Sequence, residues 1–191
     1  MSDEEPTEGS GGDDAEAASE DVPEKAPPAM DEPTPVKGLG GVREYWEDIV
    51  ADMEVTAEEY RERGWETLEL HPGQVWPDFD ARAFDVLLPD SEYEALVEFV
   101  DAGDVDDYDV FRAEVAMVFF LLVLRDEERK RAVFVPGYYD FGHGKKLYHS
   151  LDDGETLGVS AHRLKRDGTV EFALEHPEPF FPEDVREAEL E

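Results

Sequence analysis

The sequence contains no cysteine, and this absence excludes several kinds of chemistry at once. Disulfide bonds, thiolate zinc sites and cysteine nucleophiles all need a thiol. Long apolar runs are also scarce: the longest extends from Val115 to Leu124, whereas a membrane-spanning helix needs about 20 apolar residues. The first residues, Met1 to Glu5, are acidic and lack the apolar core of a signal peptide. These features favour a cytoplasmic protein with no membrane partner.

Basic residues are few: 17 Lys and Arg stand against 51 Asp and Glu, for a net charge of −34. Direct binding of DNA or RNA is therefore not expected, because it needs a basic surface. Residues 1–37 hold 12 acids and 2 bases, so most of the excess acid lies in the rest of the chain. Molar salt shortens the Debye length to about 3 Å and screens such repulsion. We interpret the acidity as adaptation to a high-salt cytoplasm; an acidic nucleic-acid mimic is the alternative.

Composition divides the chain into three parts. Residues 1–40 are rich in Glu, Asp, Pro, Gly, Ala and Ser, which is typical of a disordered tail. Residues 41–182 carry most of the aromatic and aliphatic residues and are predicted to form a single α+β domain. Residues 183–191 are predicted to be a short C-terminal tail.

The hydrophobic pattern predicts helices and strands in mixed order. Val42, Tyr45, Trp46, Ile49 and Met53 fall on one helical face. A capping-box pattern at Thr56–Glu59 predicts that a second helix begins there and ends at Gly64. The uniformly apolar run 115–124 predicts a strand covered on both faces. Further strands are expected at 65–70, 84–88, 108–114, 132–135, 157–164 and 169–174, further helices at 91–103 and 143–152, and a loop at 74–83. The predicted fold is a mostly antiparallel sheet of about six strands with helices on one face.

Familiar catalytic and metal-binding motifs fail when tested position by position. The acidic loop from Asp104 lacks the glycine and glutamate that a calcium loop needs, and Gly142–Lys146 lacks the first glycine and the Ser or Thr of a phosphate loop. Ser160 has His162 where a nucleophile elbow needs glycine. The five histidines show no ligand spacing. We therefore predict no cofactor, no metal and no identifiable catalytic residue.

One region stands out against the acidic background. Residues 141–151 contain no acid, residues 162–166 are basic, and an aromatic run precedes the first of these segments. If the helix packs beside the hairpin, these segments form a basic patch for an anionic ligand or a partner's acidic segment. The candidate binding residues are Tyr138, Tyr139, His143, Lys145, Lys146, His162, Arg163 and Arg166.

The leading hypothesis is a non-enzymatic binding or regulatory module with a protein or anionic small-molecule partner. Two alternatives stay open. The first is an enzyme with an unfamiliar site, for which Glu114, beside the buried strand, is the first acid to inspect. The second is the nucleic-acid mimic.

Four segments resemble a family of small acidic haloarchaeal proteins of unknown function. The resemblance covers about residues 42–182 and implies a halophilic origin and one compact domain, with no activity attached. The segments are Tyr45-Trp46-Glu47-Asp48-Ile49, Arg112-Ala113-Glu114, Val135-Pro136-Gly137-Tyr138-Tyr139-Asp140 and His176-Pro177-Glu178-Pro179-Phe180-Phe181.

Overall fold

The first helix is longer than the sequence pattern predicted. The structure is a computed structural model that describes residues 38–152 and 155–189. Helix α1 (Gly38–Glu62) runs without a break through the position where a second helix was predicted to begin. Thr56 is buried, and its Oγ1 donates to the carbonyl oxygen of Asp52 at 2.8 Å, as a residue inside a helix does. The predicted cap is therefore wrong. Of the predicted tail, residues 1–37 lie outside the described residues, while 38–40 begin α1.

Within the described residues, eight strands and three further helices follow α1, with one short 3-10 helix, η1, among them. Their bounds are β1 (Glu66–Glu69), β2 (Gln74–Asp78), β3 (Ala83–Leu88), α2 (Asp90–Asp101), β4 (Asp107–Glu114), β5 (Val118–Asp126), β6 (Arg131–Tyr139), α3 (Phe141–Ser150), β7 (Leu157–Arg163), β8 (Thr169–Leu174), η1 (Glu178–Phe180) and α4 (Glu183–Glu187). Strand β2 was predicted to be a loop.

The strands form two four-stranded mixed sheets, in the orders β1-β6-β5-β4 and β2-β3-β7-β8. The α+β class is confirmed, but the single antiparallel sheet of about six strands is wrong. Hairpins supply the antiparallel pairs, whereas β1 pairs in parallel with β6 and β3 with β7. Both parallel pairs join strands far apart in sequence, so local hairpin signals could not reveal them.

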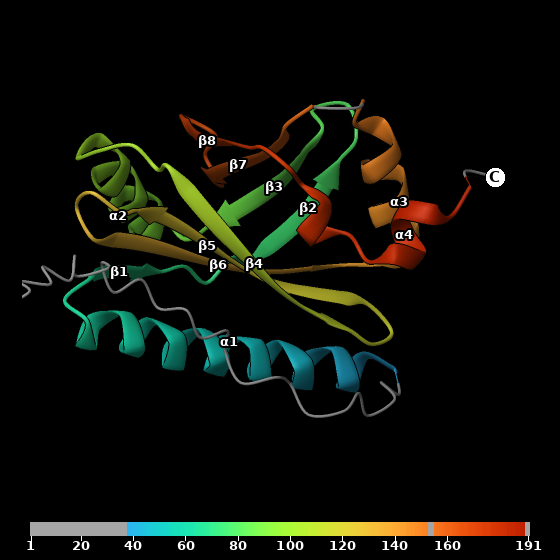
Figure 1. Ribbon diagram of the computed structural model, residues 1–191, viewed down its shortest axis with the longest axis horizontal. Coiled ribbons are helices and arrows are strands. Elements are labelled where there is room, and N and C mark those ends of the chain that lie inside the picture. The colour runs from blue at the N-terminus through green and yellow to red at the C-terminus, as the bar shows by residue number, and fades with distance from the viewer. Residues whose placement is uncertain (1–37, 153–154, 190–191) are drawn as a thin grey trace, which may run out of the picture.

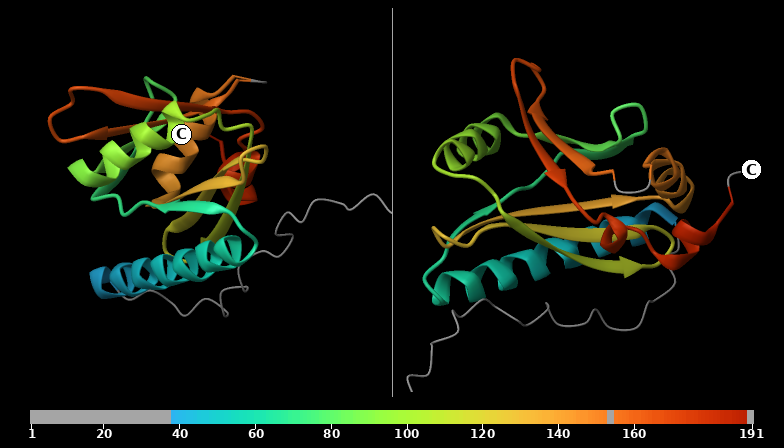
Figure 2. Two further views of the ribbon diagram at one scale, coloured as in Figure 1. Left: turned by 90° about the vertical axis from the view of Figure 1, so that its left-hand side faces the viewer. Right: turned by 45° about the horizontal axis from the view of Figure 1, so that its top comes forward.

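The two sheets and α1 form three layers (Figures 1 and 2). Strand β5 lies in the middle layer, and alternate side chains point to opposite faces. Phe119 packs in the core beneath α1, and Phe120 packs in the core between the two sheets. The strand predicted at 115–124 begins at Val118, since residues 115–117 belong to the β4–β5 connection. Every residue of β5 is buried, which confirms that the strand is covered on both faces.

The segment after β8 returns to the core between the sheets. Phe180 and Phe181 are fully buried there, and the hydroxyl of Tyr139 donates to the carbonyl oxygen of Phe180. Helix α4 then packs near α3 and buries Val185. Among the described helices, none is long and apolar enough to span a membrane.

Candidate functional site

An open cleft of about 560 Å³ lies where the first turns of α1 approach the end of β6 and strand β2. We call it the aromatic cleft. Helix α1 supplies one wall, and the loop before β2 and β2 itself supply the other. The end of β6, the start of α3 and Met117 from the β4–β5 connection supply the rest. Its lining residues are Val42, Arg43, Trp46, Pro72, Gly73, Gln74, Val75, Trp76, Pro77, Met117, Tyr138, Tyr139, Asp140 and His143.

Two pairs of rings form the apolar surface of the cleft. Trp46 meets Tyr138 edge to face, with ring centroids 5.8 Å apart. Trp76 lies against His143, with centroids 4.8 Å apart. Trp76 is 47% exposed and Tyr138 36%, although large aromatic rings usually bury most of their area. Both rings therefore offer a free face to a bound molecule.

The same rings carry unused hydrogen-bond donors. A tryptophan N–H can only donate, and a tyrosine hydroxyl can donate or accept. Within the part of the chain that the structure describes, the indole nitrogens of Trp46 and Trp76 and the hydroxyl of Tyr138 make no hydrogen bond. The aromatic cleft thus combines ring faces with donors that can serve a ligand's carbonyl groups.

Asp140 and His143 form the polar end of the cleft. The Asp140 carboxylate caps α3 by accepting from the backbone N–H of His143 at 2.9 Å, and it also contacts Nδ1 of the His143 ring. Burial alone raises the pKa of Asp140, but hydrogen bonds from the backbone and ring of His143 outweigh it and hold that pKa below its ordinary value. The carboxylate therefore fixes the His143 ring, which is tilted against the ring of Trp76.

Close packing holds α3 against the cleft. A Cβ atom at Gly144 would lie 2.2 Å from the Tyr139 ring, so glycine is required for this approach. The ring of Phe79, from the β2–β3 connection, stacks with the ring of His143, with centroids 5.9 Å apart.

Removing the Asp140 carboxylate tests this arrangement. We expect Asp140→Ala to lower the free energy of unfolding by about 1 kcal/mol, because the N-cap acceptor is lost. Asp140→Asn keeps an oxygen for the cap and should retain most of that stability while losing the charge beside His143. Chemical denaturation measures both variants, and equal losses in the two would contradict a capping role.

The predicted basic patch does not form as one surface. Tyr138, Tyr139 and His143 line the aromatic cleft, whereas Lys145 and Lys146 lie on α3 outside its lining. Lys146 has its Nζ 6.0 Å from the centre of the Phe79 ring.

The other predicted residues lie at the far end of the second sheet. Strand β7 runs away from α3 for about 20 Å at 3.3 Å per residue, so the β7–β8 turn and α3 lie well apart (Figures 1 and 2). His162 Nε2 lies 2.7 Å from Asp85 Oδ1, and Arg166 also contacts Asp85, at 3.3 Å. Arg163 contacts Glu94 at 3.0 Å and Asp167 at 2.6 Å. Acids from neighbouring elements therefore engage all three basic residues.

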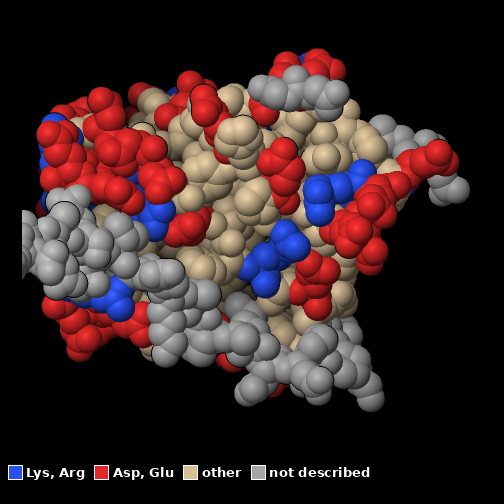
Figure 3. All heavy atoms as spheres, viewed as in Figure 1, with Lys and Arg blue, Asp and Glu red and all other residues tan. Residues whose placement is uncertain are grey.

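Basic residues elsewhere on the surface also lie next to acids. In Figure 3 the Lys and Arg side chains form small groups on the face shown, and each group borders Asp or Glu. Glu114, the acid singled out for an enzyme, is exposed and pairs with Arg112 at 3.0 Å. It does not line the aromatic cleft.

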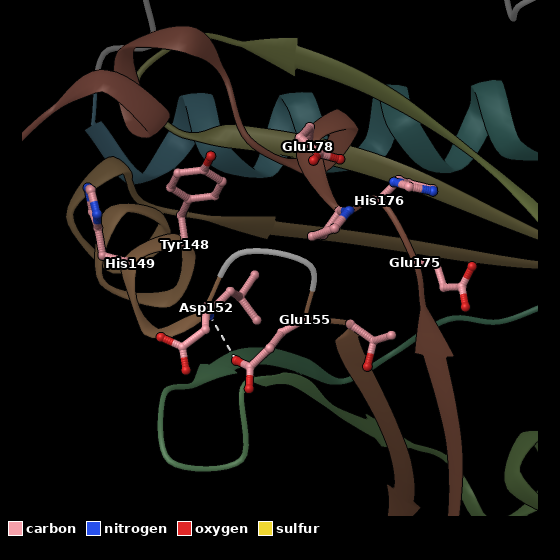
Figure 4. A pocket seen from close by; sticks show the side chains of 10 residues that line it. Tyr148, His149, Asp152, Glu155, Glu175, His176 and Glu178 are labelled. Carbon is pink, nitrogen blue, oxygen red and sulfur yellow. Dashed lines mark hydrogen bonds between the residues drawn. The ribbon is translucent and has the colours of Figure 1, made fainter.

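A second hollow, of about 470 Å³, lies between α3 and the segment after β8, and Glu114 lies outside its lining too. Its side chains are mainly polar and acidic, and Figure 4 shows His149 and Glu175 on opposite sides of it. Among the described residues, no group of three or more His, Cys, Asp or Glu is arranged to hold a metal ion. The backbone N–H of Asp152 donates to Glu155 at 2.8 Å, so part of the polar lining pairs with itself.

Sequence reasoning missed both tryptophans of the cleft. Trp46 was assigned to a helix face as core, and Trp76 was placed in a loop. Trp76 precedes Pro77, which removes a backbone donor and argues against a central strand. An edge strand such as β2 tolerates that proline. The signal that the sequence offered was a tryptophan directly before a proline, a residue that sheets accept at their edges.

The described residues thus form an α+β fold of two mixed sheets with an aromatic cleft at one end. Residues 36–182 match a family of unknown function, DUF7529, and the chain belongs to this family. No curated protein and no solved structure matches the chain.

Proposed function

We propose that this protein is a non-enzymatic binding module whose partner is a protein that inserts an extended, proline-rich segment into the aromatic cleft. The observation that carries the proposal is the pairing of exposed aromatic faces with unused donors. Trp46, Trp76 and Tyr138 each bring both a ring and an N–H or O–H group.

A proline-rich segment fits these features for a chemical reason. A polyproline II helix has no internal hydrogen bonds, so its carbonyl groups remain free to accept. Its proline rings pack on aromatic side chains, and little chain entropy is lost because the conformation is preformed. Aromatic-lined grooves recognise such segments in other folds by this combination.

The lining supports binding over catalysis. It contains no serine, threonine, cysteine or lysine, and its one carboxylate, Asp140, is engaged by the backbone N–H and the ring of His143. His143 could exchange a proton, but its ring contacts Asp140 and packs against the rings of Trp76 and Phe79. That packing suits a supporting wall better than a mobile acid or base.

We also propose that the protein works in the cytoplasm of a halophile. The support is the acid excess of the folded part, where residues 38–191 hold 39 acids and 15 bases. Repulsion across such an acidic surface destabilises the compact state, and molar salt screens that repulsion.

The direct test is titration of the ¹⁵N-labelled protein with a capped decaproline peptide. The chain has three tryptophans, of which Trp46 and Trp76 lie in the cleft, while Trp65 is buried beneath α1. We expect the indole N–H signals of Trp46 and Trp76 to move and that of Trp65 to stay. A glycine–serine decapeptide should move none of them. Unchanged signals at millimolar decaproline would refute the proposed function.

Trp76→Ala should weaken decaproline binding about thirty-fold. Removing a central tryptophan from a binding site typically costs about 2 kcal/mol. Trp76 is half exposed on an edge strand, so the fold should survive the change. Leu164→Ala is the matched control, because Leu164 is an apolar residue 80% exposed at the distant β7–β8 turn. Equal affinities for the two variants would show that Trp76 takes no part in binding.

A further inference from the structure

The chain carries a proline-rich segment of its own directly before the cleft. Residues 22–37 contain five prolines and end at Lys37, next to the first residue of α1. The wall of the aromatic cleft begins four residues into that helix, at Val42. Resting on the function proposed above, we infer that the first ligand of the cleft is this segment of the same chain, and that an external partner must displace it.

The spacing of apolar residues in the segment matches the geometry of a polyproline II helix. Pro27, Met30, Pro33 and Val36 recur every three residues. Because a polyproline II helix has three residues per turn, these four side chains would share one edge in that conformation. The next edge carries Pro28, Asp31, Thr34 and Lys37, which are mostly polar. One continuous apolar edge is what an aromatic cleft can bind.

The reach of the segment agrees with this assignment. Trp46 lies eight residues into α1 from Gly38, about 12 Å along the axis at 1.5 Å per residue. Pro33 precedes Gly38 by five residues, which span about 15 Å at 3.1 Å per residue. A chain that reverses direction before Gly38 can therefore bring Pro33 level with Trp46.

Covalent attachment makes even a weak contact effective. A short flexible connection gives an effective concentration of about a millimolar. With a dissociation constant of about 0.1 mM, the segment would occupy about nine clefts in ten and weaken an external peptide about ten-fold. The segment would then act as a built-in competitor that sets a threshold for partners.

The test compares two variants of the full chain by the same indole signals. The first replaces the apolar edge: Pro27→Ser, Met30→Ser, Pro33→Ser and Val36→Ser. The matched control replaces residues of a neighbouring edge: Ala26→Ser, Ala29→Ser and Pro35→Ser. Both sets leave the net charge and α1 unchanged.

We expect the first variant to shift the Trp46 and Trp76 signals, to leave Trp65 in place, and to bind decaproline about ten-fold more tightly than the unaltered chain. The control should match the unaltered chain in both respects. If decaproline binds all three proteins equally and the starting signals coincide, the self-docking inference is wrong while the proposed function stands. If decaproline binds none of them and the signals coincide, both are wrong. Equal shifts in the two variants would also overturn the inference, because the apolar edge would then have no special role.

Discussion

Asp126→Asn should lower the free energy of unfolding by about 3–5 kcal/mol. The Asp126 carboxylate is 1% exposed at the end of β5 and accepts from Arg131 Nη2 at 2.8 Å and from the backbone N–H of Arg129 at 3.0 Å. Arg131 is also buried: it donates to the carbonyl oxygen of Phe99 at 2.7 Å and lies 4.4 Å from the centre of the Phe99 ring. Neutralising the carboxylate would leave this guanidinium buried without its counter-ion.

The pH dependence of the stability that Asp126 contributes follows from the same contacts. Burial raises the pKa of Asp126, but hydrogen bonds from Arg131 and Arg129 outweigh it and hold the pKa below its ordinary value. The stabilisation is therefore complete above the unfolded pKa, near 3.9, and is lost as the pH falls through the lower folded value. Asp126→Asn should remove this contribution to the fall in the free energy of unfolding at low pH.

Glu128→Gln is the matched control for Asp126→Asn. Glu128 is 82% exposed and lies 3.6 Å from Arg129, so its pairing takes place in water. We expect a change within about 0.5 kcal/mol. Urea denaturation at pH 7 and at pH 3.5 measures both variants, and similar losses at Asp126 and Glu128 would contradict a buried ion pair.

The local pattern predicted most elements but could not predict how they assemble. The stripe of Ile49 and Met53 predicted the start of α1, and it continues through Ala57 and Tyr60 on the same face. No glycine or proline interrupts residues 42–62, so continuity of the stripe was a better guide than the capping-box pattern at Thr56. The strand β5 was predictable because both of its faces are apolar. Parallel pairing of β1 with β6 depends on contacts about 65 residues apart, which no local signal encodes.

The candidate site was predicted only in part, because local sequence patterns do not give distances in the fold. The run of Tyr138 and Tyr139 before α3 does lie at the cleft. The charge contrast that suggested a basic patch gave no information on distance, and the acids that engage Arg163 and Arg166 come from α2, β3 and the following turn. Trp46 and Trp76 lie 30 residues apart in sequence, and only the fold brings them to the same cleft.

Salt should govern the stability of the whole domain. We expect the free energy of unfolding to rise by roughly 5 kcal/mol or more between 0.1 M and 2 M KCl. Residues 38–191 hold 39 acids and 15 bases. The excess negative charges repel one another more strongly in the compact state than in the expanded chain. Shortening the Debye length from about 10 Å to about 2–3 Å removes most of that difference. The measurement is urea denaturation followed through tryptophan fluorescence across the KCl series.

A variant with four neutralised acids distinguishes charge screening from the general effect of salt on apolar burial. The variant carries Glu44→Gln, Glu54→Gln, Glu98→Gln and Asp101→Asn, at exposed positions for which the described residues offer no ion pair. With four fewer negative charges, it should be more stable than the unaltered chain at 0.1 M KCl and should gain less as salt is added, because less repulsion is left to screen. An unaltered chain that is most stable in dilute buffer, or a variant with the same salt slope, would show that the acidic surface is not an adaptation to salt and would require a partner to explain it.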